Sequence, residues 1–303
     1  MKKRHERRAG FTLVELIVVV AIVAVLASLV LSRFDGLLKN AGHAAAASSM
    51  ADAGQSIEAW FTANRMYPDG WDTRLSGGAL LSAAAGTTPG LPPELVGSTG
   101  RLTTYQLTAG DALGFNNVGI KTLFNMDATP LSEVSRLNDE FNTPTTLASG
   151  TTVAVINSAQ ATSSGTGTTN KIIDHIFSQN LIVGTGVPGT MTTVSQASST
   201  SGGSPTLVPA QLVAFGLGAH NMLVTGASSA TGAANPGKAF MREAPVDGSF
   251  NSALEYSRLI VVFMLTPSSS GSSSASTVTF AGVFGADGDL LTDDAAAMNN
   301  AVQ

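Results

Sequence analysis

One long apolar segment dominates the hydropathy pattern of the chain. From Phe11 to Leu31 the sequence FTLVELIVVVAIVAVLASLVL contains only three clearly polar residues, Thr12, Glu15 and Ser28. As an α-helix this segment would be about 31 Å long, which matches the hydrocarbon thickness of a bilayer. We therefore expect residues 11–31 to form a membrane-spanning helix.

Charge is unevenly distributed between the two ends of the chain. Residues 1–10 carry five basic side chains and one acidic side chain, a net charge of +4. The whole chain carries −5, so residues 11–303 carry −9. Basic residues in front of an apolar span stay on the cytoplasmic side. We therefore expect a single-pass membrane protein with its larger part in the periplasm or an equivalent extracytoplasmic space, and the mildly acidic chain predicts no direct binding of nucleic acid.

Two ordinary interpretations of the apolar segment remain open. A secretory signal peptide would be cut near the small residues of 25–27, whereas a simple signal anchor would not be cut. The segment is long for a signal peptide, and neither interpretation explains Glu15. Because an ionisable group at membrane depth costs about 2.5–3.5 kcal/mol, we expect Glu15 to have a partner or a function.

A short motif offers a specific explanation for this acid. Residues 10–15 read Gly-Phe-Thr-Leu-Val-Glu and follow a basic leader. This arrangement closely resembles the class III signal of type IV pilins and type II secretion pseudopilins. The resemblance implies that a membrane prepilin peptidase cuts after Gly10 and methylates the new N-terminus at Phe11. It also implies that Glu15 acts in subunit assembly, as the counter-ion of that amine on a neighbouring subunit.

A second helical segment follows the apolar run. Residues 32–66 are rich in alanine and place Ile57, Trp60 and Phe61 on one helical face. The turn-forming residues 67–70, Tyr-Pro-Asp-Gly, then end the helix. A continuous helix from the start of the apolar run to residue 66 would be about 84 Å long. The tyrosine-proline pair resembles the motif that follows the stalk helix in the same family.

Aromatic residues gather at the predicted end of this helix. Trp60, Phe61, Tyr67 and Trp71 all lie where the helix meets the following domain. Large aromatic side chains bury much apolar area. We expect this group to pack in the core rather than to form a ligand platform.

Residues 67–303 form the predicted extracytoplasmic head, which is poor in charge and rich in serine, threonine and glycine. Short apolar runs bounded by turn residues indicate strands. Polar stretches at 158–170, 195–206 and 267–276 indicate surface loops. We predict an α+β fold in which an antiparallel sheet packs on the outer half of the stalk helix. The predicted strands are 152–156, 172–183, 211–217, 221–225, 258–266 and 277–284.

Four carboxylates lie close together near the C-terminus, at Asp287, Asp289, Asp293 and Asp294. Crowded acids repel one another unless a hard cation with oxygen ligands joins them. Their spacing differs from that of an EF-hand loop, but the segment resembles the acidic C-terminal loop of major pseudopilins, which implies bound Ca²⁺. The alternative is structural, with Thr292 capping a short helix whose N-terminal dipole favours the acids. Both interpretations remain open.

Composition excludes several classes of chemistry. The chain has no cysteine and only four scattered histidines, so thiolate sites and transition-metal clusters are not expected. It contains neither a G-x-S-x-G elbow nor an H-E-x-x-H pair. His175 beside Asp174 is expected to be a partly buried strand residue rather than a catalytic base. We therefore do not expect an enzyme.

These observations lead us to expect a structural subunit of a type IV pilus-like or type II secretion pseudopilus filament. The resemblance implies three kinds of partner: prepilin peptidase, an inner-membrane assembly platform and other pilin or pseudopilin subunits. The acidic C-terminus and the lack of cysteine favour type II secretion, whereas the large head favours another machine. The alternative is a minor or tip pilin, or a membrane-anchored adhesin-like binding module.

Overall fold

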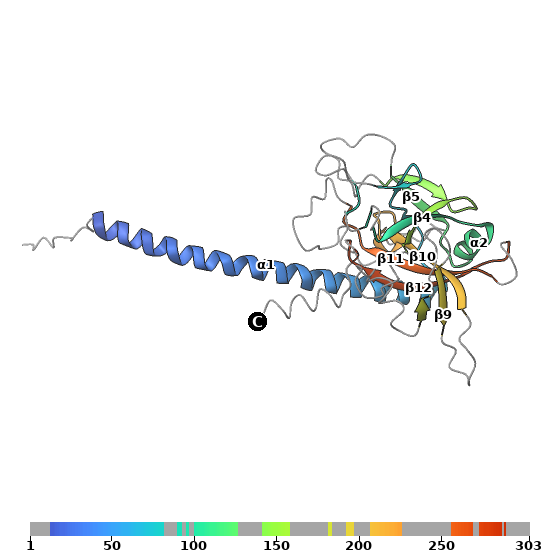
Figure 1. The fold of residues 1–303 in the computed structure, drawn as a ribbon, viewed down its shortest axis with the longest axis horizontal. Coiled ribbons are helices and arrows are strands. Elements are labelled where there is room, and N and C mark those ends of the chain that lie inside the picture. Colours follow the sequence, from blue (N-terminus) through green and yellow to red (C-terminus); the bar gives the residue numbers. More distant parts are fainter. Residues whose placement is uncertain are drawn as a thin grey trace, which may run out of the picture.

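In the computed structural model, one long helix carries a β-rich head at its C-terminal end (Figure 1). For residues 29–40, 42–43, 181–183, 192–196 and 207–209 the backbone alone is described. The described residues are 13–81, 90–92, 95–96, 100–126, 141–157, 181–183, 192–196, 207–225, 256–268, 273–286 and 288.

Helix α1 spans Leu13–Asn64, a length of 52 residues, and at 1.5 Å per residue it measures about 78 Å. Figure 1 shows its N-terminal part extending well away from the head. The helix ends where Arg65 adopts a left-handed φ of 58° and donates its backbone N–H to the carbonyl of Phe61 at 2.8 Å. The prediction of one helix is confirmed for the described residues, and its C-terminal end lies two residues earlier than predicted.

The C-terminal half of α1 is held against the head by one stripe of apolar side chains. Ala46, Met50, Ala53 and Ile57 are buried, and their spacing of three or four residues places them on one face of the helix. They belong to the same core as buried residues of the sheet. This face packs against strand β12, Thr277–Phe284.

Replacing Gly54 by alanine should stabilise the protein. A Cβ at Gly54 would meet Val283 Cγ2 at 3.9 Å, an ordinary contact distance, and alanine favours a helix over glycine by about 0.8–1.0 kcal/mol. We expect Gly54→Ala to raise the free energy of unfolding of the full chain in detergent by about that amount. Gly114→Ala is the matched control, because a Cβ at this helical glycine would overlap the carbonyl of Ser276. A loss of stability at Gly54, or a gain at Gly114, would contradict this packing.

In the described residues, ten strands form the main sheet, and a separate hairpin joins β2, Leu75–Ser76, to β3, Ala79–Leu80. The continuous path through the sheet is β12-β11-β10-β1-β5-β6. Strand β7 pairs with β4 and β10, and β9 pairs with β8 and β10. The predicted antiparallel sheet is therefore largely confirmed, but β1 and β5 are parallel. The other bounds are β1 Trp71–Asp72, β4 Leu102–Gln106, β5 Thr122–Asn125, β6 Thr143–Thr146, β7 Thr152–Ile156, β8 Leu181–Val183, β9 Thr192–Gln196, β10 Leu207–Gly216 and β11 Ile260–Thr266.

Most of the predicted strands that fall on described residues are confirmed. Residues 152–156 and 277–284 coincide with β7 and β12. Residues 211–217 correspond to the second part of β10, and 258–266 correspond to β11, which begins at Ile260. Strong β-formers bounded by turn residues therefore located the central strands.

The strand predicted at 221–225 is wrong, because this segment forms the short helix α4, Met222–Thr225. Asn221 starts the helix: its side-chain oxygen accepts the backbone N–H of Leu223 at 3.0 Å. Its backbone carbonyl accepts the N–H groups of Val224 and Thr225, each at 2.9 Å. A capping asparagine thus overrode the apolar run that suggested a strand.

The remaining predictions for the head are tested only in part. The loop predicted at 158–170 lies outside the described residues, and of the strand predicted at 172–183 the structure describes only Leu181–Val183, as β8. The loop predicted at 195–206 is wrong at its first residues, because β9 continues through Gln196. Ser195 pairs with Leu207 on β10 and with Ile182 on β8, and Gln196 pairs with Leu181, so pairing with neighbouring strands accounts for this extension.

The sheet is buried on both faces. On β10, Val213 and Phe215 join the core that contains α1, whereas Leu212 and Ala214 join a second core on the opposite face. Alternate residues of a strand point to opposite faces, so a strand covered on both sides is apolar throughout. Helix α2, Ala109–Asn117, contributes Phe115 to the first core.

Candidate functional site

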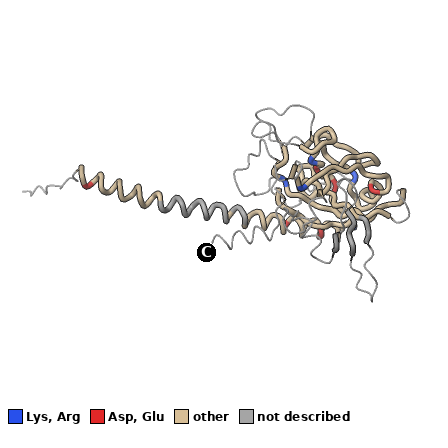
Figure 2. The backbone as a smooth tube through the Cα atoms, viewed as in Figure 1, with Lys and Arg blue, Asp and Glu red and all other residues tan. Residues whose placement is uncertain are grey.

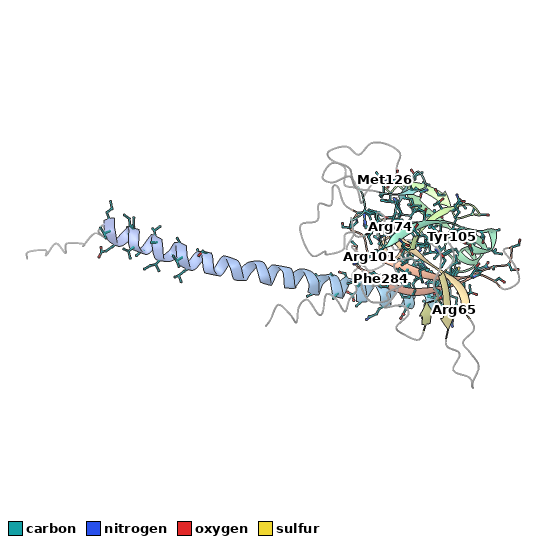
Figure 3. All side chains as sticks on the ribbon, viewed as in Figure 1. Arg65, Arg74, Arg101, Tyr105, Met126 and Phe284 are labelled. Carbon is teal, nitrogen blue, oxygen red and sulfur yellow. The ribbon has the colours of Figure 1, made fainter. Side chains whose placement is uncertain are left out.

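The N-terminal part of α1 is an exposed apolar surface, Leu13–Ser28. Every residue in it is exposed in the isolated chain, and its large apolar side chains are 51–73% exposed. Figure 3 shows these side chains projecting from the helix far from the head. Scattered apolar residues are ordinary on a protein surface, but a continuous apolar run around a helix indicates contact with lipid or with other chains.

Charge is nearly absent from this surface, as Figure 2 shows. Its single charged residue is Glu15, in the first turn of α1, where the positive end of the helix dipole favours a carboxylate. Ser28 is also polar, but its hydroxyl donates to the carbonyl of Val25 at 2.8 Å. The helix therefore satisfies Ser28 internally.

For the membrane span predicted over residues 11–31 the finding is negative. Within the part of the chain that the structure describes, no helix is both long and apolar enough to cross a bilayer.

Several predicted site residues lie outside the described residues. These include Gly10 and Phe11 of the predicted cleavage site, together with His175 and its neighbour Asp174. The four candidate calcium ligands, Asp287, Asp289, Asp293 and Asp294, also lie outside them. Among the residues that are described, no group of three or more His, Asp or Glu side chains is placed to hold a metal ion.

The turn after α1 fastens the helix to the sheet. The hydroxyl of Tyr67 accepts the backbone N–H of Phe280 on β12 at 3.0 Å, and its ring stacks on Phe61 of α1 at 4.5 Å between centroids. The indole N–H of Trp71 donates to the carbonyl of Pro68 at 2.6 Å. Tyr67 and Trp71 are buried and Trp60 and Phe61 pack on the same core. The prediction that these aromatic residues form core is confirmed.

Asp69 makes the same turn a junction for two further segments. Its Oδ1 accepts the backbone N–H groups of Lys121 at 2.9 Å and Thr122 at 2.7 Å. Its backbone carbonyl accepts the N–H of Met222 on α4 at 3.0 Å. Gly70 follows with a φ of +85°, and a Cβ there would overlap the carbonyl of His220. The end of α1 is thus joined to β5, α4 and β12 within four residues.

A buried polar cluster inside the head has no counterpart in the sequence predictions. It consists of Asp72, Arg74, Tyr256 and Arg258, each at most 1% exposed. The hydroxyl of Tyr256 donates to Asp72 Oδ2 at 2.7 Å, and Arg74 Nη2 donates to the carbonyl of Arg258 at 3.1 Å. The Arg74 guanidinium carbon lies 5.1 Å from the centre of the Tyr256 ring, a cation–π distance. Figure 3 shows Arg74 inside the head.

Burial changes the acid–base properties of this cluster. It raises the pKa of Asp72 from 3.8 to about 7, against the hydrogen bond from Tyr256 and the charges of Arg258 and Arg74. It lowers the pKa of Arg74 to about 10, and it raises the pKa of Tyr256 well above 10. Desolvation disfavours every charged form here, so Asp72 titrates near neutral pH while Arg74 stays protonated.

Two glycines make room for this cluster. A Cβ at Gly216 would overlap the Tyr256 hydroxyl, and a Cβ at Gly218 would overlap the Asp72 carboxylate. Arg74 itself has a left-handed φ of 64°, which costs about 1–2 kcal/mol for a residue with a side chain. Buried charge, backbone strain and close packing therefore meet in one place.

Only a weak signal in the sequence marked these residues. Asp72 and Arg74, like Tyr256 and Arg258, are two positions apart, the spacing that places side chains on one face of a strand. The Tyr256–Asp72 bond joins residues 184 positions apart. Neither periodicity nor composition relates two short segments at that separation.

The comparison with protein families bears on the N-terminal segment. Residues 6–31 match the prokaryotic N-terminal methylation motif, and this range includes Gly10, Phe11 and Glu15. The motif indicates a prepilin-processed, type IV pilin-like protein that is anchored in a membrane and exported. No curated protein and no solved structure shows a significant match to the chain.

Proposed function

We propose that the chain is a structural subunit of a type IV pilus-like or type II secretion pseudopilus filament. The observation that carries this proposal is the exposed apolar surface, Leu13–Ser28, which lies inside the methylation motif. Before assembly the surface suits the hydrocarbon core of the inner membrane. After assembly it suits the same surface on neighbouring copies, in a bundle of parallel helices whose packing excludes solvent.

Cleavage would prepare this surface for assembly. Removing residues 1–10 takes away a net charge of +4 and leaves a single amine on Phe11, which the prepilin peptidase methylates. In an apolar bundle that amine needs a counter-charge. Glu15 is the only acid on the exposed surface, and we assign it to the amine of an adjacent copy. This pairing would set the axial register between subunits.

The head would follow the helix as one body. The hydrogen bonds of Tyr67 and Asp69 connect the end of α1 to β12, β5 and α4, so a displacement of the helix is transmitted to the sheet. This suits a mechanical role in which growth of the filament moves the heads outward. We place the protein with other pilin or pseudopilin subunits and an inner-membrane assembly platform as partners.

Replacing Glu15 by alanine tests the proposed pairing. The variant should be cleaved by the peptidase but should fail to form filaments, because the buried amine would have no counter-ion. Filaments sheared from cells that carry the whole assembly machine can be counted by electron microscopy and immunoblotting. Ser28→Ala is the matched control, since its hydroxyl bonds within its own helix, and it should assemble normally.

Two results would contradict this role for Glu15. One is a normal yield of filaments from Glu15→Ala. The other is an equal loss from Glu15→Ala and Ser28→Ala, which would show that any polar change on the surface is harmful. A chain that is cleaved but recovered only in small amounts beside a smaller, abundant pilin would identify a minor or tip subunit instead.

We also propose that Asp287, Asp289, Asp293 and Asp294 bind Ca²⁺. Calcium at about 100 times its Kd should stabilise the full chain by about 2.7 kcal/mol, seen as a rise in Tm. Asp287→Ala combined with Asp293→Ala should abolish the rise, whereas Asp52→Ala, an exposed acid on α1, should preserve it. No rise in the unaltered chain, or a rise that survives the double substitution, would exclude this site.

A further inference from the structure

Strand β1 is the connection between two parts of the main sheet. It has only two residues, and it pairs antiparallel with β10 through Asp72 and Gly216 and parallel with β5 through Trp71 and Leu123. In the described sheet path β12-β11-β10-β1-β5-β6, strands β5 and β6 reach β10 through it. The residues directly before β1 fasten α1 to the head. A change in the interactions that position β1 would therefore affect both the sheet and the junction between α1 and the head.

Asp72 is the side chain that anchors β1 in the interior of the head. It is completely buried, and its Oδ2 accepts the hydrogen bond from Tyr256, which lies just before β11. Among the described residues, its other oxygen, Oδ1, has no hydrogen-bond partner. A buried carboxylate with one unsatisfied oxygen is costly. Protonation removes the buried charge, which is the largest part of that cost, so the geometry itself favours the neutral acid.

In the part of the chain that the structure describes, the charged groups around Asp72 come from two segments. Tyr256 and Arg258 face it from the segment before β11, and Arg74 faces it from the residues after β1. Strand β10 presents Gly216 and the loop after it Gly218, neither of which titrates. Strand β5 presents Phe124, the partner of Asp72 in register, whose ring stacks on His220 at 4.2 Å.

These groups oppose one another. Loss of water around Asp72 disfavours the charged carboxylate, while the two arginines and the tyrosine hydroxyl favour it. The balance brings the change in protonation to neutral pH, since the pKa of Asp72 is about 7. An isolated buried acid would ionise at a higher pH, and an exposed one would ionise near 4.

We propose that Asp72 and Tyr256 form a proton-operated latch on β1. With Asp72 neutral, the latch holds β1 between β10 and β5. When Asp72 ionises, its charge draws water into the seam between β1 and β10, and the junction of the stalk with the sheet loosens. Between about pH 4 and about pH 7 the folded state keeps a proton on Asp72 that the unfolded state has already released. The stabilisation is therefore full at low pH and declines as the pH rises to about 7.

Thermal unfolding of the full chain in detergent tests the latch. Between about pH 5.5 and about pH 7 the Tm should fall as the pH rises, and it should level off above the pKa of Asp72 towards about pH 8.5. Asp72→Asn cannot ionise, so its Tm should be nearly constant across this range. Tyr256→Phe removes a hydrogen bond that favours the carboxylate, so the pH at which the Tm levels off should move higher.

Asp111→Asn is the matched control, because Asp111 is also a buried and hydrogen-bonded acid. Burial alone would raise the pKa of Asp111, but hydrogen bonds from Ser276, Thr108 and Tyr105 lower it overall. Its stabilisation is therefore lost only as the pH falls below the range tested. Asp111→Asn should lower the Tm by a constant amount and leave the slope of Tm against pH unchanged.

Infrared spectroscopy of the unaltered chain keeps the test independent of whether the variants fold. A carboxylic acid band should be present at about pH 5.5 and disappear with a midpoint near the pKa of Asp72. Amides of β1 should exchange hydrogen faster above that midpoint than their intrinsic rates predict. The proposal is overturned if the Tm is flat or rises over this range, if Asp72→Asn keeps the full slope, or if no such band titrates.

Discussion

Replacing Gly10 by leucine should leave the chain as an uncut precursor in the membrane. The proposed cut follows Gly10, which lies within the methylation motif over residues 6–31, and glycine allows a peptidase to approach the backbone closely because it has no Cβ. A loss of at least about tenfold in cleavage rate is expected, equivalent to about 1.36 kcal/mol in the activation barrier. Immunoblotting of cells that express the peptidase would separate the precursor from the shorter product.

Ala9→Ser is the matched control for this prediction. It alters the adjacent leader residue by one small polar group and keeps Gly10, so cleavage should proceed as in the unaltered chain. Normal cleavage of Gly10→Leu would show that the site lies elsewhere. Equal failure of both variants would show that the leader as a whole, and not the glycine, is read by the peptidase.

Replacing Gly218 by alanine should strongly destabilise the head, although it adds only one methyl group. The new Cβ would overlap the carboxylate of Asp72, which is buried and held by Tyr256. Overpacking at such a site costs about 3 kcal/mol, which lowers the Tm of a domain of this size by roughly 6–12 °C. Thermal unfolding of the full chain in detergent would measure the change.

A double-mutant cycle separates this clash from a general effect of alanine. In a chain that already carries Asp72→Ala the space is open, so the added cost of Gly218→Ala should fall to less than about 1 kcal/mol. Gly150→Ala serves as a control, because nothing lies within 4 Å of its Cβ position and only its positive φ opposes alanine. Additive effects of the two substitutions would contradict the packing of Gly218 against Asp72.

The elements that the sequence predicted well are those governed by local preferences. Helix α1 follows from a long apolar segment and an alanine-rich segment that contain no proline, and β7 and β12 follow from β-branched residues between turn residues. The helix ends shortly before residues 67–70, although it is the left-handed Arg65 and not the proline that closes its last turn. Each of these elements is decided by residues within a few positions of one another.

The elements that could not be predicted depend on contacts between distant segments. Strand β1 has two residues, too few to show any periodicity, and its parallel pairing with β5 is set by the junction at Asp69. The buried cluster joins Asp72 to Tyr256, which is 184 positions away in the sequence. Helix α4 was missed for another reason, because a single capping residue, Asn221, outweighed an apolar run.

The candidate assembly site resembles the locally determined elements, because its motif could be found in the sequence, but the roles of its residues could not be tested there. The short motif around Gly10 and Glu15 is contiguous in sequence, and residues 6–31 match the methylation motif that it suggested. The structure adds that the following turns of α1 are exposed on every side in a single copy. The predicted roles of Phe11 and Glu15 depend on other proteins, the peptidase and a second subunit, so they remain predictions.

Intact-mass and N-terminal fragment analysis of the protein from cells with its peptidase tests the central claim most directly. Maturation as a pilin-like subunit predicts one dominant species that lacks residues 1–10, begins at Phe11 and carries one added methyl group on its amine. A dominant species that begins at any other residue, or one that retains the leader in the presence of active peptidase, would contradict this maturation.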